Sequence, residues 1–245
     1  GVRPSGDDRD QRRGERAGGG RLFGRRRPFT SAQWMLGAAS GAGGAPGALG
    51  GASPSPPSPS PPSPPSPSSM PMLETERLLM RPPGRDDHQL LRDLVADPDV
   101  HRFLGPRAAD PVTDMFSRTL RGGGSWFFYG YGTFMAFERH SGAFVGQLGV
   151  FHSMRGFGKN MDDVAEAGWI VAKAHWGKGY AAEGMSEALR WIDTVHALPR
   201  TSCMIERGNT SSVKLAERLG YLRYDEHDLG DGVIVDLFER IRAQG

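Results

Sequence analysis

Glu166-Ala-Gly-Trp-Ile-Val-Ala-Lys-Ala-His-Trp-Gly-Lys-Gly-Tyr-Ala-Ala-Glu-Gly184 is the stretch around which the sequence is organised. The residues from Val164 to Val171 are mostly apolar and include β-branched side chains, which predicts a strand. The end of the stretch opens a helix with an apolar face, and Gly177 and Gly179 lie between the two elements. A glycine-rich turn from strand to helix points several backbone N–H groups at one place, beside the positive end of the helix dipole. The stretch therefore predicts a site for an anion such as a phosphate or pyrophosphate.

Two common phosphate-binding loops fit this turn poorly. A Walker A loop requires Ser or Thr after its lysine, but Gly179 follows Lys178. A dinucleotide-binding fingerprint requires a glycine three residues after its second glycine, where this chain has Ala182. An ordinary connection, whose glycines serve only the turn, remains open at this point.

The 245 residues are of two kinds. Residues 1–69 hold most of the prolines and nine arginines against four acidic residues, a net charge of +5. Such a segment has little to bury, so we expect a disordered or polyproline-like tail or linker. The rest carries 21 basic and 24 acidic side chains, a net charge of −3, and suffices for one domain, which we place at residues 73–240. Its charge gives no reason to expect nucleic-acid binding.

The cysteine, histidine and apolar residues indicate which compartment, metal content and membrane association to expect for the protein. Cys203 is the single cysteine, which excludes a disulfide within the chain and suits a reducing, cytoplasmic compartment. We expect Cys203 to be a buried, inert thiol in a strand. No apolar run reaches the ~20 residues that span a bilayer, so no membrane partner is expected. The seven histidines are scattered without metal-ligand spacing, so no metal site is expected.

The N-terminal segment allows two further interpretations. Arg26-Arg27-Pro28-Phe29 resembles the core of a twin-arginine export signal, although no cleavage site is evident and a long Pro/Ser run follows. The other interpretation is an over-extended reading frame, with the natural start at Met70 or Met72.

The order of the expected elements indicates a mixed sheet with helices packed on it. A helix should begin at the cap residue Asp86, with Gln89 as its capping-box partner, and end before Asp97-Pro98. A second helix should end at Gly122-Gly-Gly124. The expected strands are 77–81, 132–139, 143–151, 164–171, 200–206, 221–227 and 233–240, and the other expected helices are 178–195 and 209–219.

Several motifs in this order resemble the GNAT superfamily of acyl-CoA-dependent N-acetyltransferases. Two of them are Trp176-Gly-Lys-Gly-Tyr-Ala181 and Asn209-x-x-Ser212, the latter followed by Leu219-Gly220-Tyr221. Glu74-Thr-Glu-Arg-Leu78, Asp97-Pro-Asp-Val100 and Gly146-Gln-Leu-Gly149 resemble its RimJ/RimL-type branch, the ribosomal-protein N-terminal acetyltransferases and their relatives. The likeness covers residues 73–240. It implies an α/β (α+β) fold, with a mostly antiparallel sheet of six to seven strands and about four helices.

The resemblance implies acetyl-CoA as cosubstrate and a primary amine as acceptor, most simply a protein N-terminal α-amine, in a monomer or homodimer. Acetyl-CoA's pyrophosphate is expected on the N–H groups of Gly177, Lys178, Gly179, Tyr180, Ala181 and Ala182. Trp176 stands where the family motif has Gln or Arg. The pantetheine arm is expected between the strands 164–171 and 200–206, near the backbone of Ile170 and Val171. Lys178 either adds charge near a phosphate or is a solvated lysine at the helix start.

The resemblance also assigns the chemistry of the transfer. Glu166 is the first candidate for the general base, with Glu138, His152 and Asp163 as weaker ones; an ion-paired or solvated Glu166 remains open. The family's tyrosine acid is missing, since Ala216 occupies its position. Ser212 is then the candidate hydrogen-bond donor to the leaving thiolate, whose pKa near 8.5 demands no strong acid. Asn209 is expected to hold the pantetheine or a water, or to act as a plain N-cap.

The acceptor is the least determined part of the prediction. The aromatic run from Trp126 to Tyr131 is expected beside the acceptor site, or else as core packing under a loop. Besides a protein N-terminus, an amino sugar or amino acid fits the residues as acceptor. A non-catalytic acyl-CoA-binding module also remains open, because Ala216 replaces the tyrosine.

Overall fold

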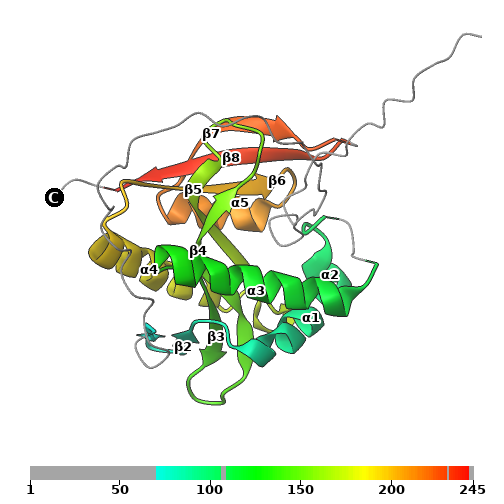
Figure 1. Ribbon diagram of the computed structural model, residues 1–245, viewed down its shortest axis with the longest axis vertical. Coiled ribbons are helices and arrows are strands. Elements are labelled where there is room, and N and C mark those ends of the chain that lie inside the picture. The colour runs from blue at the N-terminus through cyan, green and yellow to red at the C-terminus, as the bar shows by residue number, and fades with distance from the viewer. Residues whose placement is uncertain (1–69, 106–108, 231, 243–245) are drawn as a thin grey trace, which may run out of the picture.

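One sheet, with strand order β1-β2-β3-β4-β5-β6-β8-β7, runs through the described part of the chain (Figure 1). The computed structural model describes residues 70–105, 109–230 and 232–242. The predicted tail, residues 1–69, and the export-like sequence within it lie outside the described residues. The strands within the described part are β1 Leu73–Glu74, β2 Leu78–Arg81, β3 Thr133–Glu138, β4 Phe144–Met154, β5 Asp162–Val171, β6 Arg200–Glu206, β7 Leu222–Asp228 and β8 Ile234–Ile241.

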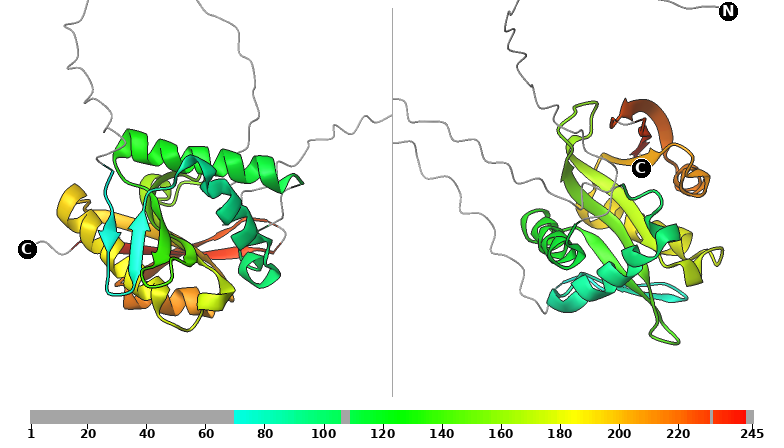
Figure 2. Two further views of the ribbon diagram at one scale, coloured as in Figure 1. Left: turned by 90° about the horizontal axis from the view of Figure 1, so that it is seen from below. Right: turned by 90° about the vertical axis from the view of Figure 1, so that its right-hand side faces the viewer.

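Helices cover both faces of this sheet (Figure 2). The α-helices within the described part are α1 His88–Ala96, α2 Pro98–His101, α3 Pro111–Tyr129, α4 Tyr180–Trp191 and α5 Thr210–Arg218. Short 3-10 turns at Arg85–Asp87 and Lys173–His175 precede α1 and α4, and a π-helical turn at Ile192–His196 continues α4. On one face, Leu91 and Leu94 of α1 and Met115 of α3 are buried with Met135 and Ile170 of the sheet. These contacts place α1 and α3 over the carboxyl end of β5.

Helix α4 packs on the opposite face and comes unusually close to the sheet. Met185 and Leu189 are buried in the main core with Leu78 and Leu148. The approach depends on Gly184, where a Cβ atom would meet the Leu148 side chain at 2.9 Å. Only glycine fits there without displacing β4. This contact fixes where the first turn of α4 lies relative to β5.

Neighbouring strands are antiparallel except β5 and β6, which are parallel. Their ladder consists of a single recorded pair, Glu166 with Ser202. By contrast, β4 and β5 pair continuously from Gly146–Val171 to Ser153–Val164. The two parallel strands therefore diverge beyond Glu166, toward their carboxyl ends.

The fold class predicted from the sequence is confirmed, with differences in detail. The sheet is mixed and mostly antiparallel, and within the described residues it has eight strands and five α-helices instead of six to seven and about four. The additional strand is the two-residue β1, and the additional helix is the four-residue α2, whose N-cap Asp97 accepts from the N–H of Asp99.

Two predicted helix boundaries are wrong. Helix α3 does not end at Gly122-Gly-Gly124 but continues to Tyr129 and ends at Gly130, whose φ is 74°. The burial of Trp126, whose Nε1 donates to the Thr133 carbonyl at 3.0 Å, offsets the roughly 1 kcal/mol that each helical glycine costs relative to alanine. Asp86 caps no helix: α1 begins at His88 after a 3-10 turn, and it has no side-chain cap.

Candidate active site

The site lies at the carboxyl ends of the two diverging parallel strands. Beyond the pair Glu166–Ser202, the facing backbone edges of β5 and β6 separate. Each strand leads directly into a helix, β5 through a glycine turn into α4 and β6 through Asn209 into α5. Crevices at the carboxyl ends of parallel strands, with helix N-termini beside them, are where α/β sheets bind phosphorylated ligands.

The glycine turn before α4 has the geometry of an anion site. Gly177 and Gly179 have φ values of 73° and 80°, in the left-handed region that favours glycine. Gly179 is the N-cap of α4, and no side chain caps that end. Within the described structure, no group accepts a hydrogen bond from the backbone N–H groups of residues 177–182. These amides are therefore available to one anion at the positive end of the α4 dipole.

Side chains of Arg77, just before β2, and of Glu138, at the end of β3, hold this turn and the start of α4. The Arg77 guanidinium donates to the Lys178 carbonyl at 2.9 Å and pairs with Glu183 in the first turn of α4. Tyr180 is buried, and its hydroxyl donates to Glu138. Only the backbone of Tyr180 is thus offered to a ligand, whereas the Lys178 side chain is exposed.

Trp176, predicted as part of the cofactor site, does not fill the turn. Its side chain is 47% exposed, and its Nε1 donates to the Val171 carbonyl at 2.7 Å. Val171 is half-buried and pairs with Gly146 of β4, where a Cβ atom would meet the Ile170 carbonyl oxygen at 2.2 Å. Gly146 therefore keeps β4 close to the end of β5, and Ile170 lines the pocket described next.

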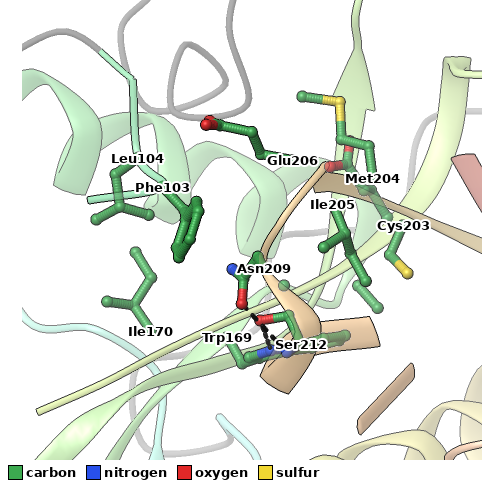
Figure 3. A pocket seen from close by; sticks show the side chains of 13 residues that line it. Phe103, Leu104, Trp169, Ile170, Cys203, Met204, Ile205, Glu206, Asn209 and Ser212 are labelled. Atoms are coloured by element: carbon green, nitrogen blue, oxygen red, sulfur yellow. Dashed lines mark hydrogen bonds between the residues drawn. The ribbon is translucent and has the colours of Figure 1, made fainter. Parts of the chain in front are cut away.

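A pocket opens between β5 and β6 (Figure 3). It is closed on one side by the chain that follows α2 and on the other by the start of α5. Asn209 is the N-cap of α5, and its Oδ1 accepts from the Ser212 N–H at 3.2 Å. The Ser212 hydroxyl in turn accepts from Trp169 Nε1 at 3.2 Å. The lining residues are Phe103, Leu104, Glu166, Ala167, Gly168, Trp169, Ile170, Cys203, Met204, Ile205, Glu206, Asn209 and Ser212.

Glu166, the predicted base, lines this pocket but is held by a cation. Both of its carboxylate oxygens accept from the Arg155 guanidinium, with 2.7 Å between Nε and Oε2. Both side chains are buried, at 3% exposure each. Burial, and next the charge of Glu166, raise the pKa of the neighbouring Cys203 thiol. The paired state that the sequence left open is therefore the state of Glu166 in the structure.

A second carboxylate in the pocket was not singled out from the sequence. Glu206 is the last residue of β6 and is half-buried. Burial raises the pKa of its carboxyl group above the usual value. In the part of the chain that the structure describes, no cation pairs with this carboxylate and no group donates to it. The available signal was its position, at the carboxyl end of a predicted strand three residues before the helix cap.

The other candidates for acid–base chemistry lie away from the pocket lining. Glu138 accepts from Tyr180 and Ser141 in the hairpin region. His152 lies between the Tyr131 hydroxyl at 2.8 Å and Asp163 at 2.9 Å. These three side chains do not line the pocket.

The aromatic run at 126–131 does not line the pocket either. Trp126 and Tyr131 are buried in the core, whereas Phe127 and Phe128 are exposed on α3. The aromatic residues that line the pocket are Phe103, after α2, and Trp169 of β5. The buried state predicted for Cys203 is confirmed, since its side chain is 1% exposed, and Tyr221 is buried as well.

The described ranges contain neither a cluster of potential metal ligands nor a helix suited to a membrane. No three His, Cys, Asp or Glu side chains come together as potential metal ligands among these residues. No helix in this part of the chain is both long and apolar enough to cross a membrane.

An unpaired amide cluster beside diverging parallel strands is the kind of site that suits a phosphorylated ligand. Comparison with known families makes this specific: the acetyltransferase (GNAT) domain matches residues 77–222, more than half of the chain. The chain therefore belongs to the GNAT family of acetyltransferases.

Individual relatives agree with this family. A solved GnaT-family acetyltransferase from Bordetella pertussis is 32% identical with a TM-score of 0.61, over 69% of this chain and 98% of that one. An acetyltransferase from Agrobacterium tumefaciens is 26% identical with a TM-score of 0.59, over 71% of this chain and 96% of that one. The uncharacterized protein YkkB of Bacillus subtilis is 28% identical over 60% of this chain and 83% of its own length. RimL, solved in complex with coenzyme A, shares the fold alone, with a TM-score of 0.53 and 14% identity, over 69% of this chain and 97% of that one.

Proposed function

We propose that this protein transfers an acetyl group from acetyl-CoA to a primary amine, and that its acceptor is a protein N-terminal α-amine. The observation that carries the proposal is the set of unpartnered amides at residues 177–182, next to the opening between β5 and β6. A pyrophosphate suits the amides, and an extended arm suits the edges of two separating strands.

In this proposal each part of acetyl-CoA has its own contact surface. The pyrophosphate binds the amides from Gly177 to Ala182, with Lys178 free to add charge. The pantetheine arm runs between β5 and β6 along Ile170 and Val171, and Asn209 hydrogen-bonds to it from the start of α5. The thioester then lies toward Glu166–Ser202, where the strands meet.

The acceptor preference follows from proton chemistry. An α-amine has a pKa near 8, so about a tenth of it is neutral at pH 7, whereas a lysine with a pKa near 10.4 is almost wholly charged. A carboxylate is a strong enough base to deprotonate the α-amine, but it is a weak base for the lysine side chain. The pocket offers carboxylates and apolar walls such as Phe103 and Leu104, which fit a chain end with a small side chain.

Departure of the thiolate needs little help from the protein. The α5 position of the missing tyrosine acid is Ala216, which is fully buried. The Ser212 hydroxyl accepts from Trp169 and keeps its own proton for a hydrogen bond to the sulfur. A thiolate whose conjugate acid has a pKa near 8.5 is stable enough to leave with that single donor.

The test is thiol release from acetyl-CoA in the presence of unblocked peptides, the same peptides with blocked N-termini, amino sugars and amino acids. We expect release with unblocked peptides only, with one acetyl group found on the N-terminus by mass spectrometry. Thiol release with an amino sugar or amino acid, and not with peptides, would identify that small molecule as the acceptor in place of a protein N-terminus. Tight acetyl-CoA binding without release by any amine would instead favour a non-catalytic binding module.

A further inference from the structure

Two carboxylates line the pocket, and they differ in what surrounds them. Both oxygens of Glu166 are taken by the buried Arg155. While this pair is in place, neither carboxylate oxygen of Glu166 is free to take a proton from a substrate. A general base needs the opposite, an ionised carboxylate that binds a proton readily.

Glu206 meets that requirement. Its carboxylate is partly withdrawn from water, and within the described residues it has neither a cation nor a hydrogen-bond donor. Partial burial of an unpaired carboxylate lowers the stability of the folded protein. Such a carboxylate in a pocket therefore indicates that it interacts with a ligand. Burial also raises the pKa of the Glu206 carboxyl group.

The position of Glu206 suits the acceptor side of the pocket. Along β6, Cys203 and Ile205 point into the core that contains α4, so Met204 and Glu206 point to the opposite face. Phe103 and Leu104 close the pocket on that face. Figure 3 shows the Glu206 side chain extending from the end of β6 to the side of the pocket where Leu104 and Phe103 lie. The amides of residues 177–182 belong to the turn before α4 and to its first residues, and α4 packs on the other face of the sheet from Glu206.

We propose that Glu206, not Glu166, accepts the proton of the acceptor amine; this inference rests on the proposed acetyl transfer. The neutral amine nitrogen forms a bond to the thioester carbon, and its proton passes to the Glu206 carboxylate directly or through one water. The C–S bond then breaks, and the CoA thiolate takes a proton from solvent through the Ser212 hydroxyl. The products are the N-acetylated amine and CoA thiol, and Glu206 returns its proton to water.

The test is the pH dependence of kcat/KM with an unblocked peptide for the wild type, Glu206→Gln and the control Glu217→Gln. Glu217 lies on the exposed side of α5, outside the pocket. For Glu206→Gln we expect a fall in kcat of about 10²- to 10³-fold, the size of a general base, with the Kd of acetyl-CoA within twofold of wild type. Glu206→Asp should recover part of the rate.

The pH profile separates proton transfer from a merely structural role. In the wild type, two protonations limit kcat/KM on the acid side, that of the amine and that of Glu206. In Glu206→Gln, kcat/KM should depend on the protonation of the amine only. In Glu217→Gln, it should still depend on both protonations. An unchanged rate and profile in Glu206→Gln, in an enzyme that acetylates peptides, would overturn this inference alone. A wild type that acetylates no amine would overturn the proposed function, and this inference with it.

Discussion

The two walls of the pocket each carry one glutamate, held in opposite ways. On β5, Glu166 sits where the strands meet, fully buried and bound by Arg155 through both oxygens. On β6, Glu206 sits where the strands have separated, half-buried and without a partner in the described structure. The difference teaches that burial alone does not mark a functional carboxylate, because a buried charge with a partner serves the fold. The carboxylate left without one is available for a substrate.

The largest effect should come from breaking the pair on β5. Arg155→Met leaves the Glu166 carboxylate buried without its cation, so we expect a loss of about 3–5 kcal/mol in the free energy of unfolding. Urea denaturation measures it. The double variant Arg155→Met/Glu166→Leu should recover most of this loss, because no unpaired charge remains. A single variant as stable as wild type would show that Glu166 is not held as a structural pair.

The next effect concerns the anion site, through two matched glycines. Gly177 and Gly142 have φ values of 73° and 72°, and a Cβ at either would meet no atom within 4 Å. Alanine at each should therefore cost a similar roughly 1–2 kcal/mol of stability. Only Gly177→Ala should weaken acetyl-CoA binding, by about tenfold, because relief of strain turns amides away from the pyrophosphate. Calorimetric titration checks both variants, and equal affinities would contradict this role for the turn.

A smaller effect is expected at the leaving group. Ser212→Ala removes the hydroxyl that accepts from Trp169 and faces the pocket. Because the thiolate leaves readily at neutral pH, kcat should fall less than about tenfold. The loss should shrink with a thioester whose thiol is more acidic than that of CoA. A hundredfold fall in kcat would instead make Ser212 an essential acid.

The smallest effect is a gain in stability. Above its raised pKa, Glu206 in the folded state carries a charge that burial disfavours, so Glu206→Gln should be slightly more stable than wild type at pH 7. We expect less than about 1 kcal/mol, because the side chain is only partly buried. Below the usual glutamate pKa the carboxyl group is protonated in both states, so the gain should vanish. Thermal melting at both pH values measures it, and a lower Tm at pH 7 would mean that Glu206 has a structural partner.

Much of the fold could be predicted from the sequence because its local signals agree with the tertiary structure. The strand of residues 200–206 has the predicted bounds, and helix α5 follows Asn209 as its cap predicts. The predicted helix end at Gly122-Gly-Gly124 was wrong because helix propensity is a local property. Helix α3 continues past these glycines, and its last turn buries Trp126. Gly130 has the same stop signal as Gly122, and only packing distinguishes them.

The glycine turn before α4 could be predicted from the sequence, whereas the surroundings of the pocket carboxylates could not. The amide cradle is one continuous segment, so residues 177–182 show it directly. The state of Glu166 depends on Arg155, which directly follows the neighbouring strand β4 and which no local sequence pattern connects to Glu166. Glu206 is singled out by its position in the pocket without a cation or hydrogen-bond donor among the described residues. That property appears only in the folded structure.

The most direct test of this account is a crystal structure with a bisubstrate compound in which CoA is joined through its acetyl group to the α-amine of a short peptide. The account predicts the pyrophosphate on the amides of Gly177 to Ala182, the pantetheine between β5 and β6, and the Glu206 carboxylate within reach of the peptide nitrogen, directly or through one water. Glu166 should stay bound to Arg155. A structure in which Glu166 leaves Arg155 and approaches that nitrogen, with Glu206 turned to solvent, would contradict it.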